Sequence, residues 1–566
     1  MSAGRKAVVT MKTIIIGGVA GGASAAARLR RLKEHDEIII LERGEYVSFA
    51  NCGLPYYIGG VITQKGSLTL QTPESFKARF RIDVRVLNEA VKLDPETKTV
   101  TVRNLASGEV YTENYDSLIL SPGAEPIRPN IDGADGENVF TLRNIPDTFR
   151  IKAYIDEKKP KTAVVVGGGY IGVEMAENLV NAGLDVTIAE LADHLIAPLD
   201  LDMAADVHRY IRNKGIKLVL NNGISAIDGN TVILQNGSIP ADMVIMSVGV
   251  RPETSLAKDC GISTNSRGSI ITDAHMRTNI DGIYAVGDAV EVADFITGKP
   301  AFIPLAGPAN KQGRIAANNI AGFDSEYTGT QGSAVLKVFD MTVATTGLNE
   351  KSAAAAGIEY DKTYTYSASH ASYYPGGANM SIKALWDKKT LKLIGAQIVG
   401  FDGVDKRLDV IASAIRFGAK VTDLTELELC YAPPFGSAKD PVNMLGFVAE
   451  NIVTGNVKQF FWDDVEKLPR DGSVTLLDVR TPVEVSRGSI DGFMNIPLDS
   501  LRESLDKLPK DKPVYVHCHS GLRSYIACRI LTGRGYDCYN LAGGWRLYES
   551  AVNERTVPEY ICTECR

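Results

Sequence analysis

The chain has 566 residues, of which 45% are hydrophobic and 23% are charged, and its formal net charge at pH 7 is −7. This length exceeds what one hydrophobic core organises, and the charge excludes the basic excess typical of proteins that bind nucleic acid or anionic membranes. Because residues 1–10 lack a secretory apolar region and no apolar run has the roughly 18 residues of a membrane span, we expect a cytoplasmic protein with small-molecule partners.

The first predicted elements form a strand, a glycine-rich turn, a helix and a second strand. The strands cover residues 13–16 and 37–41, and the second ends at Glu42. This order predicts a dinucleotide-binding βαβ unit, in which glycines let the backbone approach a pyrophosphate and the acid binds a ribose hydroxyl. Val19 stands where G-x-G-x-x-G has its middle glycine, so a glycine-rich turn of another α/β protein is the alternative.

A second copy of this pattern carries the full fingerprint. Residues 163–166 form a strand that leads into Gly167-Gly168-Gly169-Tyr170-Ile171-Gly172, and the following strand, residues 186–189, ends at Glu190. An acid at this place hydrogen-bonds ribose hydroxyls and repels a 2′-phosphate. Glu190 therefore favours NADH, with NADPH as the weaker possibility.

Residues 118–123, between the two units, and residues 282–288, after them, complete four separated motifs. Together they resemble the two-dinucleotide-binding flavoprotein disulfide reductases, in which the first unit binds FAD and the second the nicotinamide. The resemblance implies that Asp288 binds the FAD ribitol. It implies that FAD is bound by Gly17, Gly18, Ala20, Gly21, Gly22, Glu42, Arg43, Ser121, Pro122, Gly123, Gly287, Asp288, Pro304, Leu305 and Ala306. It implies that NAD is bound by Gly167, Gly169, Tyr170, Ile171, Gly172, Glu190 and Gly249.

Cys52 lies in the segment Ser-Phe-Ala-Asn-Cys-Gly-Leu-Pro after the first unit. The best-known disulfide reductases carry Cys-x-x-x-x-Cys, but position 47 is Val and position 57 is Tyr. The oxidised form of Cys52 should therefore be a mixed disulfide, a persulfide or a sulfenic acid. We interpret Cys52 as a thiolate of lowered pKa that takes electrons from reduced FAD and breaks an S–S bond. A small buried cysteine is the alternative.

The segment around Cys52, together with residues 431–440, resembles the coenzyme A disulfide and persulfide reductases over residues 11–450. A related branch of NADH oxidases and peroxidases has a histidine at the position of Ala20, which counts against peroxide reduction. The resemblance implies that Tyr373 and Tyr431 reach Cys52 of a partner subunit, so we expect an obligate homodimer with shared active sites. It implies that coenzyme A is contacted by Ser24, Arg28, Arg31, Ser48, Asn51, Gln71 and Lys439. For the two arginines, a solvated helix face is the alternative.

A further domain begins after Asn451, with strands over residues 474–480 and 514–517 and a loop from Cys518 that opens a helix. These features resemble a rhodanese domain. Backbone N–H groups at the helix N-terminus and the charge of Arg523 would stabilise Cys518 as a thiolate or persulfide. Rhodanese-like domains that only bind partners typically lack this cysteine.

The remaining cysteines are interpreted by position, because eight cysteines in 566 residues are too few for a disulfide scaffold. Four of them lie in or beside apolar segments and are expected to be structural: Cys260, Cys430, Cys528 and Cys538. Cys562 and Cys565 form a C-x-x-C at the terminus, where the tail offers no further zinc ligands.

We predict an α/β protein with two Rossmann-like domains, the NAD domain inserted in the FAD domain, then an α+β dimerisation domain and an α/β rhodanese domain. The expected boundaries are 11–122 and 250–330 for FAD binding, 123–249 for NAD(P)H binding, 331–450 for dimerisation, 451–472 for a linker, 473–555 for the rhodanese domain and 556–566 for a tail.

The predicted activity is NADH-driven, FAD-dependent reduction of coenzyme A persulfide or polysulfide with release of sulfide, while the rhodanese domain handles sulfane sulfur. A rhodanese has no obvious task if the substrate carries no sulfane sulfur. The alternatives are a coenzyme A disulfide reductase, an NADH oxidase, and a sulfur carrier whose flavin half is regulatory. No nucleic acid and no membrane is expected as a partner.

Overall fold

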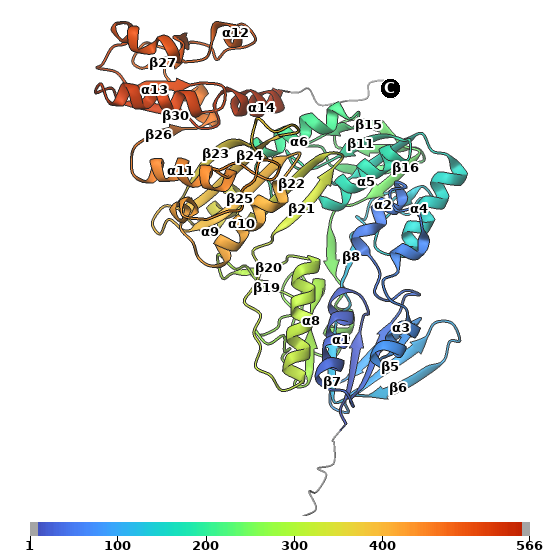
Figure 1. Ribbon diagram of the computed structural model, residues 1–566. Helices are drawn as coiled ribbons and strands as arrows, with labels where there is room; N and C mark the ends of the chain where they lie inside the picture. Colours follow the sequence, from blue (N-terminus) through green and yellow to red (C-terminus); the bar gives the residue numbers. More distant parts are fainter. Residues whose placement is uncertain (1–9, 557–566) are drawn as a thin grey trace, which may run out of the picture. The chain divides into compact units, whose positions relative to one another are not determined.

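The computed structural model describes residues 10–556 (Figure 1). These residues form two compact units: unit 1 contains residues 10–189 and Asn222–Gly332, and unit 2 contains Glu190–Asn221 and residues 333–556. The predictions for Cys562 and Cys565 lie outside the described residues. Among the described helices, none is long and apolar enough to cross a membrane.

The first sheet of unit 1 is parallel, with the strand order β18-β7-β1-β2-β3. Its strands are β1 (Lys12–Ile16), β2 (Glu37–Glu42), β3 (Asp83–Val86), β7 (Ser117–Leu120) and β18 (Ile283–Ala285). The strands β1, β2, β7 and β18 are largely buried apolar runs, as is typical of a parallel sheet covered on both faces, whereas the edge strand β3 is only partly buried. The helices α1 (Ala20–Leu32) and α8 (Ala306–Ile320) lie side by side against this sheet (Figure 1). A small antiparallel sheet follows β3, formed by β4 (Asn88–Asp94), β5 (Thr99–Asn104) and β6 (Val110–Asn114).

The second parallel sheet contains the strand order β11-β10-β16-β9 within unit 1. Its strands are β9 (Val139–Phe140), β10 (Thr162–Val166), β11 (Asp185–Ala189) and β16 (Met243–Met246). The helix α5 (Tyr170–Asn181) joins β10 to β11, so the strand-turn-helix-strand order of the first sheet is repeated. Two Rossmann-like units are therefore present, as predicted.

Unit 2 contains an antiparallel sheet with the strand order β21-β22-β25-β24-β23. Its strands are β21 (Ala334–Val338), β22 (Met341–Gly347), β23 (Tyr360–Ala368), β24 (Asn379–Asp387) and β25 (Leu393–Gly400). The helix α10 (Val404–Arg416) packs on β22 and β25, and α11 (Pro441–Val453) packs on β23. This is the α+β architecture expected of the dimerisation domain.

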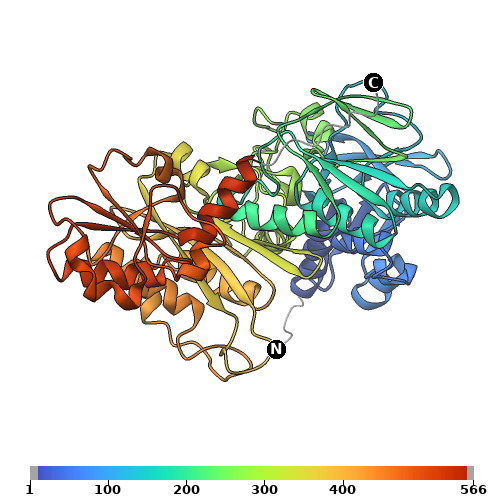
Figure 2. The same ribbon diagram turned by 90° about the horizontal axis from the view of Figure 1, so that it is seen from above.

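The C-terminal part of unit 2 is a parallel sheet with the strand order β26-β30-β29-β27-β28. The strands are β26 (Lys458–Phe460), β27 (Thr475–Asp478), β28 (Met494–Asn495), β29 (Val514–His517) and β30 (Cys538–Leu541). β26 lies in the segment 451–472 that was expected to be a linker, and Phe460 packs with Leu541. We therefore propose that this domain begins near residue 458. Its last helix, α14 (Gly544–Thr556), lies against α6 (Leu201–Asn213) in both views (Figures 1 and 2).

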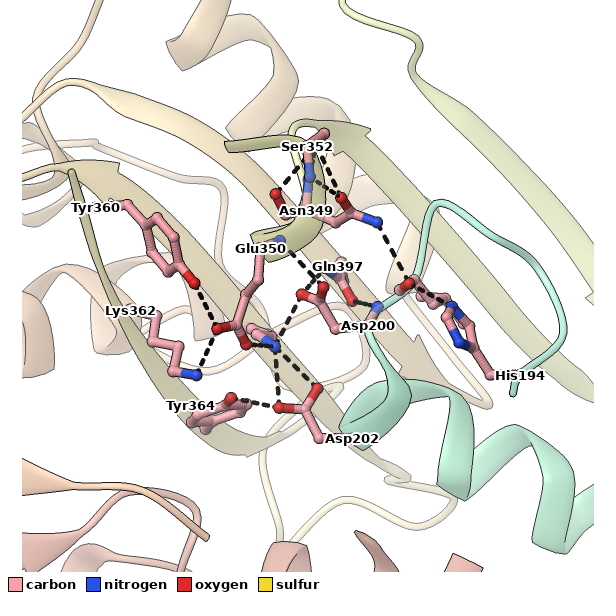
Figure 3. A network of polar contacts seen from close by, with 12 residues as sticks. His194, Asp200, Asp202, Asn349, Glu350, Ser352, Tyr360, Lys362, Tyr364 and Gln397 are labelled. Carbon is pink, nitrogen blue, oxygen red and sulfur yellow. Dashed lines mark hydrogen bonds and ion pairs between the residues drawn. The ribbon is translucent and has the colours of Figure 1, made fainter. Parts of the chain in front are cut away.

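A buried charge cluster lies between α6 and the antiparallel sheet (Figure 3). Lys383 on β24 is fully buried, and its Nζ lies 2.8 Å from Asp200, 2.9 Å from Asp202 and 2.5 Å from Glu350. Trp462 donates its indole N–H to Asp202 at 3.3 Å, which ties the C-terminal domain to the cluster. The sequence analysis did not predict this cluster.

Candidate active sites

The first glycine loop has the geometry of a dinucleotide-binding turn. Gly17 has φ of +97°, and a Cβ on it would lie 2.1 Å from the carbonyl oxygen of Ser121. A Cβ on Gly22 would lie 1.9 Å from the carbonyl oxygen of Gly17. Glu42, at the end of β2, accepts a hydrogen bond from the N–H of Gly18 at 2.9 Å. Only glycine permits this close packing of the backbone. The N-terminus of α1 can therefore bind a pyrophosphate, and the carboxylate of Glu42 beside it suits a ribose hydroxyl.

The other residues expected to bind FAD come from later segments of unit 1. Ser121, Pro122 and Gly123 follow β7, and Pro304 and Leu305 lead into α8 at Ala306. Asp288 lies on a short turn after β18, and burial raises the pKa of its half-buried carboxyl. A carboxylate of this kind suits ribitol hydroxyls, so the residues present fit FAD. Arg43 is already paired with Glu253 at 2.5 Å and with Glu125 at 3.2 Å.

The second glycine loop repeats this geometry. Gly167 has φ of +104° and lies so close to Ser247 that a Cβ would be 2.4 Å from its carbonyl oxygen. A Cβ on Gly172 would be 2.0 Å from the carbonyl oxygen of Gly167. α5 begins at Tyr170 and Ile171, directly after the loop, and Gly249, with φ of +111°, follows β16. The loop fits the nicotinamide cofactor, and Glu190 directly follows β11.

Cys52 is an exposed free thiol on a 3₁₀ turn, Asn51–Gly53, that runs directly into α2 (Leu54–Ile58). The surrounding protein raises the pKa of this thiol by desolvation, and the carboxylates of Glu174 and Asp288 raise it further. The prediction of a lowered pKa is therefore wrong for this structure, because desolvation disfavours the thiolate and two negative charges add to that effect. The alternative of a small buried cysteine is also wrong, since the side chain is exposed.

A cavity of about 420 Å³ in unit 1 contains five of the seven residues expected to contact coenzyme A. They are Ser24, Arg28, Arg31, Ser48 and Gln71. Arg28 and Arg31 both line this cavity, which is compatible with the expected contact to coenzyme A. Two further arginines line it and were missed by the sequence analysis, Arg79 on α3 (Pro73–Phe80) and Arg314 on α8. Four guanidinium groups around one cavity suit a ligand with several phosphates.

Lys439, Tyr373 and Tyr431 belong to unit 2, whereas Asn51 lies beside Cys52 in unit 1. The hydroxyls of Tyr373 and Tyr431 are 2.8 Å apart, and the two side chains are 73% and 48% exposed. This hydrogen bond raises the pKa of Tyr373. The structure thus brings the two predicted tyrosines together as an exposed phenol pair.

The Cys518 thiol is buried at the loop between β29 and α13 (Leu522–Thr532). The N–H of Gly521 and the hydroxyl of Ser524 donate to its sulfur at 3.1 and 3.2 Å. Arg523, expected to face the sulfur, forms two hydrogen bonds to Glu484, at 2.8 and 2.5 Å. The guanidinium of Arg523 holds the pKa of Glu484 well below its usual value. The sequence analysis missed Ser524 as a sulfur ligand and Glu484 as the partner of Arg523.

A buried ion pair, Asp478 with Arg480, lies near this loop, with His517 beside it. Burial lowers the pKa of His517 to about 4, although the carboxylate of Asp478 opposes this shift. His517 is therefore neutral near pH 7. A sequence signal for these residues exists in retrospect, since Asp478 and His517 are the last residues of two adjacent parallel strands.

The expectation that four other cysteines are structural is correct for Cys528 and Cys538, which are buried. Cys260 is half-buried. Cys430 is exposed, so it does not fit the expectation of a structural cysteine.

Three family models match the chain. The model of the pyridine nucleotide-disulphide oxidoreductases matches residues 11–313, and the model of the dimerisation domain of these proteins matches residues 333–441. The model of the rhodanese-like domain matches residues 461–551.

Individual relatives agree with these matches. The coenzyme A disulfide reductase of Staphylococcus epidermidis is 37% identical over 441 residues, which are 78% of this chain and 100% of the relative. The solved structure of reduced CoADR-RHD from Bacillus anthracis is 51% identical, covers 96% of this chain and 99% of that chain, and has a TM-score of 0.95. A NAD-dependent persulfide reductase from A. fulgidus is 36% identical, covers 95% of this chain and 100% of that chain, and has a TM-score of 0.89.

Proposed function

This chain belongs to the pyridine nucleotide-disulphide oxidoreductase family, and on that premise we propose that it reduces coenzyme A persulfide with electrons from NADH and releases sulfide. As a member of this family it is an enzyme that uses FAD and a nicotinamide cofactor. The observation that carries the proposal is the presence of two sulfur sites in one chain. One is a single exposed thiol, Cys52, in the unit that holds the arginine-lined cavity, and the other is the buried thiol Cys518.

The residues that line the cavity favour coenzyme A as the thiol that carries the reducible sulfur. Its four arginines match the phosphates of coenzyme A, while Phe76 and Phe80 add apolar surface beside them. Because Cys52 lacks a partner at position 47 or 57, it reacts with a sulfur of the substrate instead of closing a local disulfide. Both features favour a small carrier thiol over a protein disulfide.

In the proposed reaction the Cys52 thiolate attacks the carbon-bound sulfur of coenzyme A persulfide. The S–S bond breaks, a mixed disulfide of Cys52 and coenzyme A forms, and hydrosulfide leaves. FAD held by the first glycine loop and Asp288 would supply the electron transfer from NADH, and the two electrons of NADH would return Cys52 to its thiolate and release coenzyme A from the mixed disulfide. The sum is NADH, one proton and the persulfide giving NAD⁺, coenzyme A and hydrogen sulfide.

We propose that the shared active site is completed in a homodimer by Tyr373, Tyr431 and Lys439 of the other subunit. The phenol pair would protonate the departing thiolate, and Lys439 would contact coenzyme A. Cys518 would carry sulfane sulfur as a persulfide, stabilised by the donors Gly521 and Ser524. Polysulfide is the second possible source of that sulfur, and the cytoplasm is the proposed location.

Coenzyme A disulfide reduction is the second candidate activity. The cavity, Cys52 and the tyrosine pair need no contribution from Cys518 to reduce a disulfide of coenzyme A. The Staphylococcus epidermidis relative, which carries this activity in its name, aligns with 78% of this chain.

The proposed function is tested by incubating the enzyme anaerobically with NADH and coenzyme A persulfide, and measuring sulfide and NADH together. We expect one sulfide for each NADH consumed, and loss of both in Cys52→Ser. Cys518→Ser should keep this reaction but lose transfer of sulfane sulfur from thiosulfate or glutathione persulfide. A wild-type enzyme that consumes NADH without releasing sulfide would contradict the proposal.

A further inference from the structure

Residues 190–200 form a loop that leads into α6 and carries Glu190, the acid expected to bind the ribose of the nicotinamide cofactor. The loop contains no helix or strand. The carboxylate of Glu190 accepts a hydrogen bond from the N–H of Ala192 at 2.8 Å, and Leu195, in the middle of the loop, is fully buried. The position of the Glu190 carboxylate therefore depends on how the rest of the loop is held.

The side chain of His208 holds the middle of this loop. His208 lies on α6 and is fully buried, and its Nε2 accepts a hydrogen bond from the N–H of Leu195 at 3.0 Å. Burial lowers the pKa of His208, so the ring is neutral near pH 7. A neutral imidazole has one donor and one acceptor nitrogen, so an accepting Nε2 requires the proton to be on Nδ1.

Glu554, on the last helix of the rhodanese domain, places a negative charge beside that proton. Its Oε1 lies 2.9 Å from Nδ1 of His208, in an electrostatic contact that lacks the alignment of a hydrogen bond. Arg212 donates two hydrogen bonds to the carboxylate, at 2.6 and 2.8 Å. Although burial opposes it, Arg212 and His208 lower the pKa of Glu554 to about 2. The carboxylate is therefore ionised and favours the proton on Nδ1.

Further contacts fix the position of α14 on α6, and the two helices lie side by side in both views (Figures 1 and 2). Arg546, Ser550 and Glu554 are spaced by four residues, so they lie on one face of α14. The hydroxyl of Ser550 donates to Asp206 at 3.0 Å, and the guanidinium of Arg546 lies 3.9 Å from the same carboxylate. The register of α14 on α6 thus places Glu554 at His208.

We propose that Glu554 is a positioning residue for NADH, because it orients His208 and His208 holds the loop that presents Glu190 to the cofactor. The last helix of the rhodanese domain thereby contributes to nicotinamide binding. This role goes beyond the proposed function, since no sulfur substrate takes part in it. It rests on the expectation that Glu190 contacts the ribose.

The hydrogen bond to the loop is sensitive to the charge of Glu554, because a neutral histidine can move its proton between its two nitrogens. Without the carboxylate, the guanidinium of Arg212 is left near Nδ1 and disfavours a proton there. A proton on Nε2 would face the N–H of Leu195, so two donors would oppose each other and the hydrogen bond would be lost. The loop would then shift, and Glu190 would shift with it.

The test measures reduction of the bound flavin by NADH and by NADPH in anaerobic stopped flow, without a sulfur substrate. The dependence of the rate on nucleotide concentration gives an apparent Kd and a limiting rate. The test variant is Glu554→Met, which keeps the length of the side chain and removes its charge. Arg212, with a side chain 26% exposed, can then turn to water. We expect the apparent Kd for NADH to rise about fivefold, as for loss of one hydrogen bond, with the limiting rate nearly unchanged.

The nucleotide preference separates this role from a general loosening of the fold, which would weaken both nucleotides alike. The apparent Kd for NADPH should rise less than that for NADH, because the Glu190 carboxylate repels the 2′-phosphate and its displacement removes that repulsion. Added to Glu190→Ala, Glu554→Met should have little further effect, since both substitutions remove the same contact.

Ser550→Ala is the matched control. It removes a hydrogen bond between the same two helices without touching His208, and it should leave both apparent Kd values unchanged. His208→Phe is the second variant, which keeps the proposal testable should Glu554→Met fail to fold. It removes the acceptor of the Leu195 N–H and should reproduce the loss of NADH affinity. Melting temperature and FAD content show whether a variant retains its fold.

An unchanged NADH affinity in folded Glu554→Met, or in His208→Phe if Glu554→Met is not folded, would overturn the proposal. So would a full further loss when Glu554→Met is added to Glu190→Ala, because Glu554 would then act elsewhere. An unchanged nucleotide preference in Glu190→Ala would overturn the role of Glu190 and this proposal with it. Failure of the proposed function would be recognised separately, since a wild-type enzyme that does not reduce coenzyme A persulfide would leave these flavin-reduction results unaffected.

Discussion

Replacing Lys383 with Met tests the buried charge cluster of unit 2. The Lys383 ammonium is fully buried and lies within 2.9 Å of Asp200, Asp202 and Glu350. Lys362 is the second cation, bound to Glu350 at 2.6 Å. Without Lys383, three carboxyl groups share one buried site with a single ammonium, and methionine fills the space of the stem without supplying charge.

We expect Lys383→Met to lower the free energy of unfolding by about 3–5 kcal/mol, the range for removing one partner of a buried ion pair. Divided by an m-value of about 2–3 kcal/mol/M, this lowers the urea midpoint by about 1–2.5 M. The pH dependence of the stability contributed by these carboxyl groups should change sign as well. Although burial opposes it, Lys383 and Lys362 lower the pKa of Glu350 to about 2, below its unfolded value of 4.5. In wild type this stabilisation is therefore present above pH 4.5 and is lost as the pH falls toward 2.

In Lys383→Met, burial and mutual repulsion raise the carboxyl pKa values above their unfolded values, so stability is instead lost as the pH rises through the raised values. Lys383→Met should thus lower the free energy of unfolding more at pH 7.5 than at pH 4.5. Tryptophan fluorescence reports on this unit because all three tryptophans, Trp386, Trp462 and Trp545, lie in it. The control Lys389→Met removes an exposed pair with Glu359 and should cost less than about 1 kcal/mol. A Lys383→Met cost below about 1 kcal/mol, or one independent of pH, would refute the reasoning.

Three further outcomes are expected. Gly22→Ala should be purified without flavin absorbance, because its Cβ would meet the Gly17 carbonyl oxygen at 1.9 Å; retention of FAD would contradict the fit of that loop. Glu190→Ala should raise the ratio of kcat/KM for NADPH to that for NADH, and an unchanged ratio would remove Glu190 from cofactor selection. Arg79→Ala should raise KM for coenzyme A substrates about tenfold with kcat nearly unchanged, as expected for loss of one charge-assisted phosphate contact; an unchanged KM would place the ligand elsewhere.

Local patterns were sufficient to predict the two Rossmann-like units. The strands β1 and β10 begin within one residue of their predicted starts, because an apolar run followed by a glycine turn is defined by neighbours in the chain. β26 was missed because its three residues are polar in part and pair with β30, which follows about 80 residues later.

The electrostatics of the sites could not be predicted in the same way. The shift of the Cys52 pKa was predicted with the wrong sign, because desolvation in the folded chain raises this pKa and Glu174 and Asp288, more than 100 residues away in the sequence, raise it further. Lys383 stands in a strand where alternation places polar residues toward solvent, and only the packing of α6 on the sheet buries it with its carboxylates. The tyrosine pair was predicted from resemblance, since nothing local links positions 373 and 431.

The central claim is tested most directly by stopped-flow spectroscopy of the enzyme reduced anaerobically with NADH and then mixed with either coenzyme A persulfide or coenzyme A disulfide. Cys52 lies in the same unit as the arginine-lined cavity, and the chain also carries the sulfur site of Cys518. The account therefore predicts faster flavin reoxidation by the persulfide, with release of sulfide. Equal or faster reoxidation by the disulfide would contradict persulfide reduction as the main activity and would make thiol maintenance the function of the flavin half.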